Sequence, residues 1–440
     1  MKRRTEHTGR FRCPPGVRFI ARWLMFVLPV AMAILYVGLL FGGRGEPSAT
    51  SGAVDDRNVM TVEASTHHRP AIEPPNDFDA PEVRRVTVLA VGDVLLHLPV
   101  TQAAWDPKES RYRFEPFFEP VRPILKDGDI VMANMETPVA GASYGYHGYP
   151  RFNGPEAIID ALKWAGFNVL TTANNHALDQ GPDGASNTRT HIEARGLWTT
   201  GIARSAEEAE DVLMIEKNGL KTAILAYTYG TNGIPLPKDR PFLVKQIDPE
   251  AMRRDITLAR ARGADAVVVS LHFGTEYVDE PSADQRNLVY GLIADGADLV
   301  IGSHPHVLQP IEHVALDTPG GRREGWVIYS LGNFISDQRG TKRQTGGIFK
   351  AVLEKSGMNS VRVASIDFIP TWAELVTSAG RRTYRVIPLE EKDGAADEVE
   401  RVLEHVFRYV ENAGAVMPAL RAIGRPCGVA EWSRLCRGGP

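Results

Sequence analysis

The strongest constraint on the fold is a regular alternation of apolar runs and amphipathic segments between residues 84 and 335. The apolar runs are short and rich in valine, leucine and isoleucine, as expected of buried strands. The segments between them have apolar residues at helical spacing, and the one at 155–167 has a proline at its start and a glycine near its end. One hairpin is expected, with its turn at Asn218 and Gly219. Strands that alternate with helices predict an α/β architecture.

Five of the predicted strands end in side chains that are able to bind a metal ion. In chain order these are Asp93, Glu136, the run Asn174, Asn175 and His176, then His272, and the pair His304 and His306. Ligands of α/β proteins bind beyond the carboxyl ends of the strands. We therefore expect these side chains to meet in one pocket, and His97, four residues after Asp93, to line it. Each residue taken singly is also typical of a turn, a helix cap or a hydrogen-bonded core position, so the prediction rests on their joint occurrence.

The segment GSHPHVLQPIE at 302–312 contains two histidines separated by one proline. Proline disfavours the helical conformation in the residue before it, so His304 is expected to be extended. Residues i and i+2 of an extended segment face the same side, and both imidazoles are therefore expected to point into one site. The adjacent side chains of Asn175 and His176 must instead diverge, which suits two roles, one on a metal ion and the other toward a substrate.

The types of these side chains indicate a kind of metal. Carboxylate, amide oxygen and imidazole without cysteine suit divalent Mn, Fe, Zn or Mg better than soft metals. A carboxylate that bridges two ions holds them about 3.5–4 Å apart, and such a pair activates water and stabilises the leaving oxygen of a phosphate ester. The sequence thus predicts one or two divalent ions.

The N-terminal region has the pattern of a membrane anchor. Residues 1–22 contain seven lysines and arginines and one acid, and residues 23–43 contain no charge. About 20 apolar residues span a bilayer as a helix, and a basic flank stays in the cytoplasm. We expect a single-pass signal anchor at 23–43 in the cytoplasmic membrane, with the main domain on the external side; a cleaved signal peptide is the alternative. Residues 44–82, rich in Pro, Ser, Thr and acids, are expected to form a flexible linker.

The rest of the chain divides into 83–345, which carries all the candidate ligands, and 346–440, which has further predicted strands and a helix near 395–412. The second part is predicted to be a sheet extension or a small accessory lobe. Cys427 and Cys436 lie in it and are compatible both with a disulfide and with two free thiols. The net charge of −4, with no basic patch outside the N-terminus, argues against a nucleic-acid partner.

Six motifs occur along the chain, in this order: VGDVLLH, ANMETPV, TTANNHALDQG, SLHFGTEY, GSHPHVLQPIE and YSLGNFISDQ. They resemble the CapA family of capsule-biosynthesis proteins, which is associated with poly-γ-glutamate synthesis and belongs to the metallophosphatase-like superfamily. The resemblance covers roughly residues 85–340. It implies a four-layer sandwich, in which two packed β-sheets are flanked by helices and the site lies at strand ends.

The resemblance also implies roles for individual residues. One ion would be bound by Asp93 and His306, the other by Asn175, His272 and His304, with Glu136 between the two ions. His176 would be the general acid or a contact to the phosphoryl group, and Asp179 and Glu276 would orient imidazoles or pocket water. The first motif of that superfamily is Asp-x-His, whereas this chain has Asp93, Val94 and Leu95. One ligand of the first ion is therefore missing unless His97 reaches it.

Together these features predict a membrane-anchored, metal-dependent phosphoester hydrolase that serves poly-γ-glutamate synthesis or export with other capsule-synthesis subunits. Two alternatives stay open. In one, the domain is a non-catalytic scaffold of the capsule machinery, which the missing histidine of the first motif favours. In the other, it is a phosphodiesterase unrelated to capsule. The presence of His176 favours an enzyme, because a scaffold needs no general acid.

Overall fold

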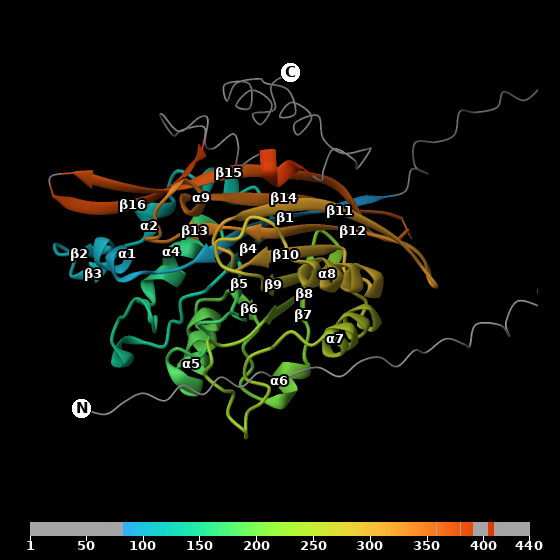
Figure 1. Ribbon diagram of the computed structural model, residues 1–440, viewed down its shortest axis with the longest axis horizontal. Helices are drawn as coiled ribbons and strands as arrows, with labels where there is room; N and C mark the ends of the chain where they lie inside the picture. Colours follow the sequence, from blue (N-terminus) through green and yellow to red (C-terminus); the bar gives the residue numbers. More distant parts are fainter. Residues whose placement is uncertain (1–81, 358, 379, 390–403, 409–440) are drawn as a thin grey trace, which may run out of the picture. The chain divides into compact units, whose positions relative to one another are not determined.

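Two β-sheets packed face to face form the centre of the structure (Figure 1). The computed structural model describes residues 82–357, 359–378, 380–389 and 404–408. The expected basic segment, the anchor, the linker up to residue 81 and both C-terminal cysteines lie outside these residues. Among the residues described, no helix is both long and apolar enough to cross a membrane.

The larger sheet has eight strands and joins a parallel half to an antiparallel half. Its order is β16 (Arg381–Pro388), β15 (Arg362–Ser378), β14 (Thr345–Ser356), β1 (Val83–Val94), β4 (Ile130–Asn134), β5 (Val169–Thr171) and β6 (Trp198–Thr200), with β13 (Asn333–Ile335) also paired to β1. Strands β1, β4, β5 and β6 run parallel, whereas β14, β15 and β16 are antiparallel to their neighbours. The strands that follow residue 345 therefore extend this sheet outward from β1.

The smaller sheet has six strands, with four parallel strands at its centre. Its order is β11 (Leu308–Thr318), β12 (Gly321–Leu331), β10 (Leu299–Ser303), β9 (Ala266–His272), β8 (Leu220–Thr228) and β7 (Leu213–Lys217). Only the edge strands β7 and β11 are antiparallel to their neighbours. The hairpin between β7 and β8 turns at Asn218 and Gly219, whose φ angles are 50° and 71°, as the sequence predicted.

Helices connect the strands and cover the outer faces of both sheets. They are α1 (Leu98–Ala103), α2 (Glu115–Phe118), α3 (Arg122–Leu125), α4 (Ala157–Ala165), α5 (Gly181–Ala194), α6 (Ala206–Glu210), α7 (Pro249–Ala261), α8 (Ala283–Asp295) and α9 (Thr341–Gln344), with a short 3₁₀ turn at Ala142–Tyr144 and a two-stranded ribbon of β2 (Trp105–Asp106) and β3 (Arg111–Tyr112). Of the helix expected near 395–412, only residues 404–408 are described, and 404–407 are helical.

Alternating residues of the central strands face different layers. In β1, Val88 and Ala90 pack between the sheets, whereas Leu89 and Val91 pack against the helices of the N-terminal half. On the far side, Val267 and Val269 of β9 pack against α7 and α8, which lie side by side (Figure 1). The order of layers is thus helices, sheet, sheet, helices. This confirms the α/β architecture.

Local signals fix where the long helices begin and end. The side chain of Asp248 accepts hydrogen bonds from the first backbone N–H groups of α7. Ser282 and Gln285 form a capping box at the start of α8, and Gly296, with φ of 120°, ends that helix. The end of α8 at Gly296 sets where the next strand, β10, enters the sheet.

Two glycines allow backbones to approach closely beside the strand ends that carry candidate ligands. A Cβ on Gly92 would lie 1.8 Å from the Gly332 carbonyl oxygen, and a Cβ on Gly302 would lie 1.9 Å from the Tyr329 carbonyl oxygen. The amide of Asp93 donates to the Gly332 carbonyl at 3.0 Å. Any side chain at Gly92 would push this strand pair apart and displace Asp93.

We predict that Gly92→Ala lowers the free energy of unfolding by more than about 2 kcal/mol, because the added methyl group has no room. Gly291→Ala is the matched control, since no atom lies within 4 Å of a Cβ built at this exposed position in α8. It should stabilise the protein by about 0.5–1 kcal/mol, because alanine favours helix. Urea denaturation followed by circular dichroism measures both values, and equal midpoints for the two variants would contradict the steric argument.

Candidate metal centre

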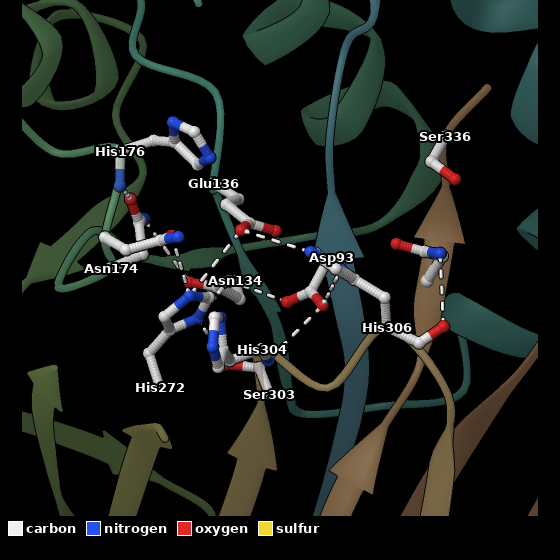
Figure 2. Close-up of polar contacts among 12 residues, drawn as sticks. Asp93, Asn134, Glu136, Asn174, His176, His272, Ser303, His304, His306 and Ser336 are labelled. Atoms are coloured by element: carbon white, nitrogen blue, oxygen red, sulfur yellow. Dashed lines mark hydrogen bonds and ion pairs between the residues drawn. The ribbon is translucent and has the colours of Figure 1, made fainter. Parts of the chain in front are cut away.

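The carboxyl ends of strands from both sheets meet at one buried cluster (Figure 2). Asp93 lies at the end of β1 and Glu136 two residues beyond β4, both in the larger sheet. His272 is the last residue of β9, and His304 follows β10, both in the smaller sheet. Because the strands concerned run in the same direction within each sheet, their polar ends face one another across the sandwich.

One group of candidate ligands consists of Asp93, Glu136 and His306, all of them buried. The Nδ1 atom of His306 lies 3.0 Å from Oδ2 of Asp93, and its Nε2 atom lies 3.8 Å from Oε1 of Glu136. The other carboxylate oxygen of Asp93 accepts a hydrogen bond from Asn134 at 2.8 Å. Asp93 is therefore held on both oxygens and cannot rotate away from His306.

A second group consists of Glu136, His272 and His304, and the amide of Asn175 reaches the same point. The Nε2 atom of His272 lies 3.0 Å from Oδ1 of Asn175 and 3.5 Å from Oε1 of Glu136. Metal–ligand bonds of about 2.0–2.2 Å place two ligand atoms of one ion about 3–3.5 Å apart. These donor atoms thus have the spacing of a metal site, and Glu136 belongs to both groups.

Glu276 adds a third carboxylate at the exposed side of the cluster. It follows β9 in the loop before α8, and its carboxylate can share one ion with the nitrogens of His304 and His306. The resemblance implied that Glu276 orients imidazoles or pocket water. Its position at the exposed side of the cluster is also suitable for a direct ligand.

Burial controls the protonation of the imidazoles. It lowers the pKa of His272 well below the ordinary value, and burial together with His306 lowers the pKa of His304 to about 4. Burial alone would also lower the pKa of His306, but the negative charges of Glu136 and Asp93 raise it to about 9. His272 and His304 are therefore neutral near pH 7, which is the form that binds metal.

Glu136 provides the test of whether these residues fit a metal ion. Its side chain is wholly buried, and neither carboxylate oxygen has a hydrogen-bond partner among the described residues. Burial and the charge of Asp93 raise the pKa of Glu136 well above its ordinary value. The buried Nδ1 of His304 likewise has no partner in the described part of the chain. Buried polar atoms without partners cost about 1–3 kcal/mol each, so the donor set fits a bound cation.

His176 lies beside these groups and belongs to none of them. Its Nδ1 atom is 2.7 Å from Oδ2 of Asp179, and the same oxygen accepts a hydrogen bond from the backbone N–H of Phe152 at 2.7 Å. The rings of Phe152 and His176 pack at right angles, with their centroids 4.7 Å apart. Because Asp179 takes Nδ1, Nε2 is the ring nitrogen that can face a substrate.

The prediction of an extended backbone at His304 and His306 is wrong. Their φ angles are +97° and +57°, so neither residue is extended. The chain leaves β10 at Ser303 and reverses into β11 at Leu308, and this short reversal requires left-handed backbone. The turn lets the backbone N–H of His304 point at Asp93, 3.4 Å from Oδ2. The two imidazoles reach the same cluster by this route, with ring centroids 6.0 Å apart.

His97 lies near the cluster and joins none of the groups of candidate ligands. Its Nδ1 atom accepts a hydrogen bond from the backbone N–H of Asp337 at 3.3 Å. Its ring packs against that of Phe152, with centroids 5.3 Å apart. Burial lowers its pKa to about 4. It therefore does not replace the histidine that is missing from the first motif, where Leu95 is buried.

Several residues that hold the candidate ligands were not singled out from the sequence. Asn134 donates to Asp93 and also lies 3.2 Å from Nδ1 of His272, and Ser303 lies 3.0 Å from the same nitrogen. Asn333 in β13 pairs with Asp93 of β1. It donates a hydrogen bond to the carbonyl oxygen of His306 at 3.3 Å. Asn134 and Ser303 are the last residues of β4 and β10, so the rule that selected the ligands also applies to these two positions.

Two exposed tyrosines border the cluster. The ring centroids of Tyr229 and His304 are 4.6 Å apart, and those of Tyr277 and His306 are 6.1 Å apart. Both side chains are about half exposed, at 48% and 47%. They give the site an aromatic border on the side that faces solvent.

A protein-family model described as bacterial capsule synthesis protein PGA_cap matches residues 87–338, more than half of the chain. The capsule biosynthesis protein CapA of Bacillus anthracis is 29% identical over 343 residues, which cover 74% of this chain and 79% of that protein. The PGA biosynthesis protein CapA of Bacillus subtilis (strain 168) is 34% identical over 259 residues, which cover 57% of this chain and 64% of that one.

Solved structures of phosphoesterases give weaker matches. The NAD nucleotidase NadN of Haemophilus influenzae matches with a TM-score of 0.41 and 11% identity, over 80% of this chain and 60% of that one. The calcineurin-like phosphoesterase YfkN of Bacillus subtilis matches with a TM-score of 0.40 and 14% identity, over 78% of this chain and 100% of that one. At such low TM-scores these likenesses do not bear on the chemistry of the site.

We predict that Mn²⁺ or Zn²⁺ raises the melting temperature of chelator-treated protein by about 3–8 °C, because ions bind the folded cluster only. Glu136→Gln should abolish most of this shift, because it removes the charge shared by two groups. The metal-free variant should be at least as stable as the wild type, since a buried carboxylate without hydrogen bonds is removed. Glu119→Gln, an exposed carboxylate outside the cluster, is the control. An unchanged metal shift in Glu136→Gln would exclude Glu136 as a ligand.

Proposed function

The chain belongs to the PGA_cap family of bacterial capsule synthesis proteins, and from this premise we propose that it hydrolyses a phosphate ester with the help of bound divalent metal. The observation that carries the proposal is Glu136, a buried carboxylate without hydrogen-bond partners that is shared by two groups of candidate ligands. Such a carboxylate has the chemistry of a residue between two ions, as the metallophosphatase-like resemblance implies.

The side chains divide into those that hold metal and those that handle the substrate. Asp93, Glu136 and His306 would hold one ion, and Asn175, His272 and His304 would hold the other together with Glu136. Bound ions would supply Lewis-acid chemistry and neutralise the charge of a phosphate ester. Asn134 and Ser303 fix the imidazole of His272, as hydrogen-bond partners of metal-binding histidines do.

His176 is the proposed general acid. The Asp179 carboxylate holds its Nδ1 atom, and Phe152 fixes the plane of the ring. Nε2 can then donate a proton to the leaving oxygen as its bond to phosphorus breaks. The same arrangement also suits a hydrogen bond to a phosphoryl oxygen, so His176 would stabilise the reacting group in either role.

The biological role is proposed from the family. The two Bacillus relatives carry the names of capsule and PGA biosynthesis proteins. We infer that this chain serves the synthesis or export of poly-γ-glutamate and works with other subunits of a capsule machinery. A phosphodiesterase outside capsule synthesis would use the same metal cluster, and the presence of capsule-synthesis proteins in a purified complex would decide against it.

A non-catalytic scaffold is the second candidate, and one observation favours it. Leu95 replaces the histidine of the first motif, and His97 does not compensate, because its Nδ1 is bonded to the Asp337 amide. The first ion would then have fewer protein ligands. Glu276, which approaches His306 from the solvent side, offers one replacement.

We predict that the metal-loaded protein hydrolyses bis(p-nitrophenyl) phosphate and that His176→Ala lowers kcat about 10²–10⁴-fold. The variant should keep the metal-induced shift in melting temperature, because His176 belongs to no ligand group. His147→Ala is the control, since this exposed imidazole contacts the Tyr144 carbonyl. Absence of turnover in the metal-loaded wild type, across several phosphodiesters, would favour the scaffold.

Residues 23–43 are the proposed anchor, on the basis of their uncharged apolar sequence and basic flank. We predict that a C-terminal epitope is digested by protease added to intact spheroplasts, because the main domain is external. Deletion of 23–43 should leave the protein in the soluble fraction on the cytoplasmic side. Protection of the epitope in intact cells, with digestion only after lysis, would reverse the proposed topology.

A further inference from the structure

A pocket lies at the end of the sandwich opposite the candidate metal centre. It has a volume of about 870 Å³ and is lined by residues at the starts of β9, β10 and β15 and by part of β12. The metal cluster lies at the other ends of β9 and β10. Since β9 runs from Ala266 to His272 at about 3.3 Å per residue, the two sites are about 20 Å apart. The pocket has the size of a ligand site.

The pocket is positively charged, although the whole chain has a net charge of −4. Its cationic lining residues are Arg260, Arg322, Arg323, Lys355 and Arg362, and its acidic ones are Asp265, Asp298 and Glu324. Five cations against three acids leave a surplus of two positive charges. A pocket with this surplus attracts anions.

The acids of the pocket already have cationic partners. Asp298 accepts from Arg260 at 2.6 Å and from the backbone N–H of Val267 at 2.7 Å. Asp265 lies 2.5 Å from Nζ of Lys355, and Glu324 pairs with Arg322 at 2.8 Å. Arg362 pairs with Glu354 at 2.5 Å, just outside the lining, so Arg323 is the lining residue whose charge is left without an ion pair.

Arg323 lies within electrostatic reach of Asp298, but no acid among the described residues is hydrogen-bonded to it. Its Nε and Nη2 atoms are buried, and neither has a hydrogen-bond partner among the described residues. The nearby acceptors are taken by Arg260, which donates to the Gly296 carbonyl at 2.7 Å and to Asp298. A guanidinium presents Nε and Nη2 as a parallel pair of donors, which match the two oxygens of a carboxylate or phosphate.

We propose that this pocket binds an oxyanion-bearing ligand, with Arg323 as its anchor, and that the ligand is a segment of a polycarboxylate chain. The anion site follows from the unpaired donors of Arg323 and the surplus of positive charge. The choice of carboxylate rests on the proposed role in poly-γ-glutamate synthesis. Arg362 and Arg322, which also line the pocket, would meet further carboxylates of the chain, and Val361 and Ala364 would contact its methylene groups.

Isothermal titration of the purified full-length chain with γ-linked hexaglutamate tests the proposal. A chelator keeps the metal centre empty, so the anion cannot bind through metal. Hexaglutamate should bind the wild type, and Arg323→Gln should weaken binding about tenfold or more, because a charge-assisted double hydrogen bond is lost. Arg253→Gln removes an equal charge from the exposed face of α7, outside the pocket, and should bind like the wild type.

Ala364→Trp provides a second variant, in which an added side chain fills the pocket while Arg323 stays in place; it too should lose binding. Equal affinity in wild type and Arg323→Gln, or no binding to the wild type, would overturn the proposal. If tripolyphosphate binds the wild type more tightly than hexaglutamate does, and Arg323→Gln weakens that binding, the carboxylate assignment is overturned. Because titration requires no turnover, absence of phosphodiesterase activity leaves this result unaffected.

Discussion

The structure depends on the burial of charge where the carboxyl ends of two sheets meet. Asp93 and Glu136 are fully buried, and they lie against three imidazoles that are themselves almost free of solvent. Carboxylates of this kind are stable in a protein interior only when donors or cations compensate them. Asp93 has hydrogen-bond donors in Asn134 and His306, whereas Glu136 has no hydrogen bond among the described residues and only longer contacts to imidazoles, at 3.5 and 3.8 Å. This difference marks Glu136 as a candidate metal ligand more directly than any single distance.

The surroundings of the cluster give each side chain one orientation. The close approach of Gly92 to Gly332 sets the position of Asp93, and Asn134 and Ser303 set the ring of His272. His304 and His306 have left-handed backbone, which is strained. The contacts around the cluster compensate for this strain. A site that is held in this way can bind ions without large rearrangement.

The two ends of the sandwich differ in their chemistry. One end gathers carboxylates and neutral imidazoles, which suit cations, and the other gathers guanidinium groups around an open pocket, which suit anions. In a protein of capsule polymer synthesis, these ends would serve separate tasks. The metal centre would act on a phosphate ester, while the cationic pocket would hold a carboxylate chain about 20 Å away. Both ends share β9 and β10, so the core between the sheets determines their separation.

The sequence by itself determined the architecture and the identities of the clustered residues. Apolar alternation located the strands, and the rule that ligands gather at strand ends selected Asp93, Glu136, Asn175, His272, His304 and His306, which the structure brings together with Glu276. The conformation of His304, the position of His97 outside the ligand groups, and the supporting contacts of Asn134 and Asn333 were decided by the tertiary structure. So was the pocket around Arg323, because its lining residues come from strands of different sheets. Periodicity along the chain reports which face a side chain takes, whereas distances across two packed sheets depend on register and turn geometry that no local pattern contains.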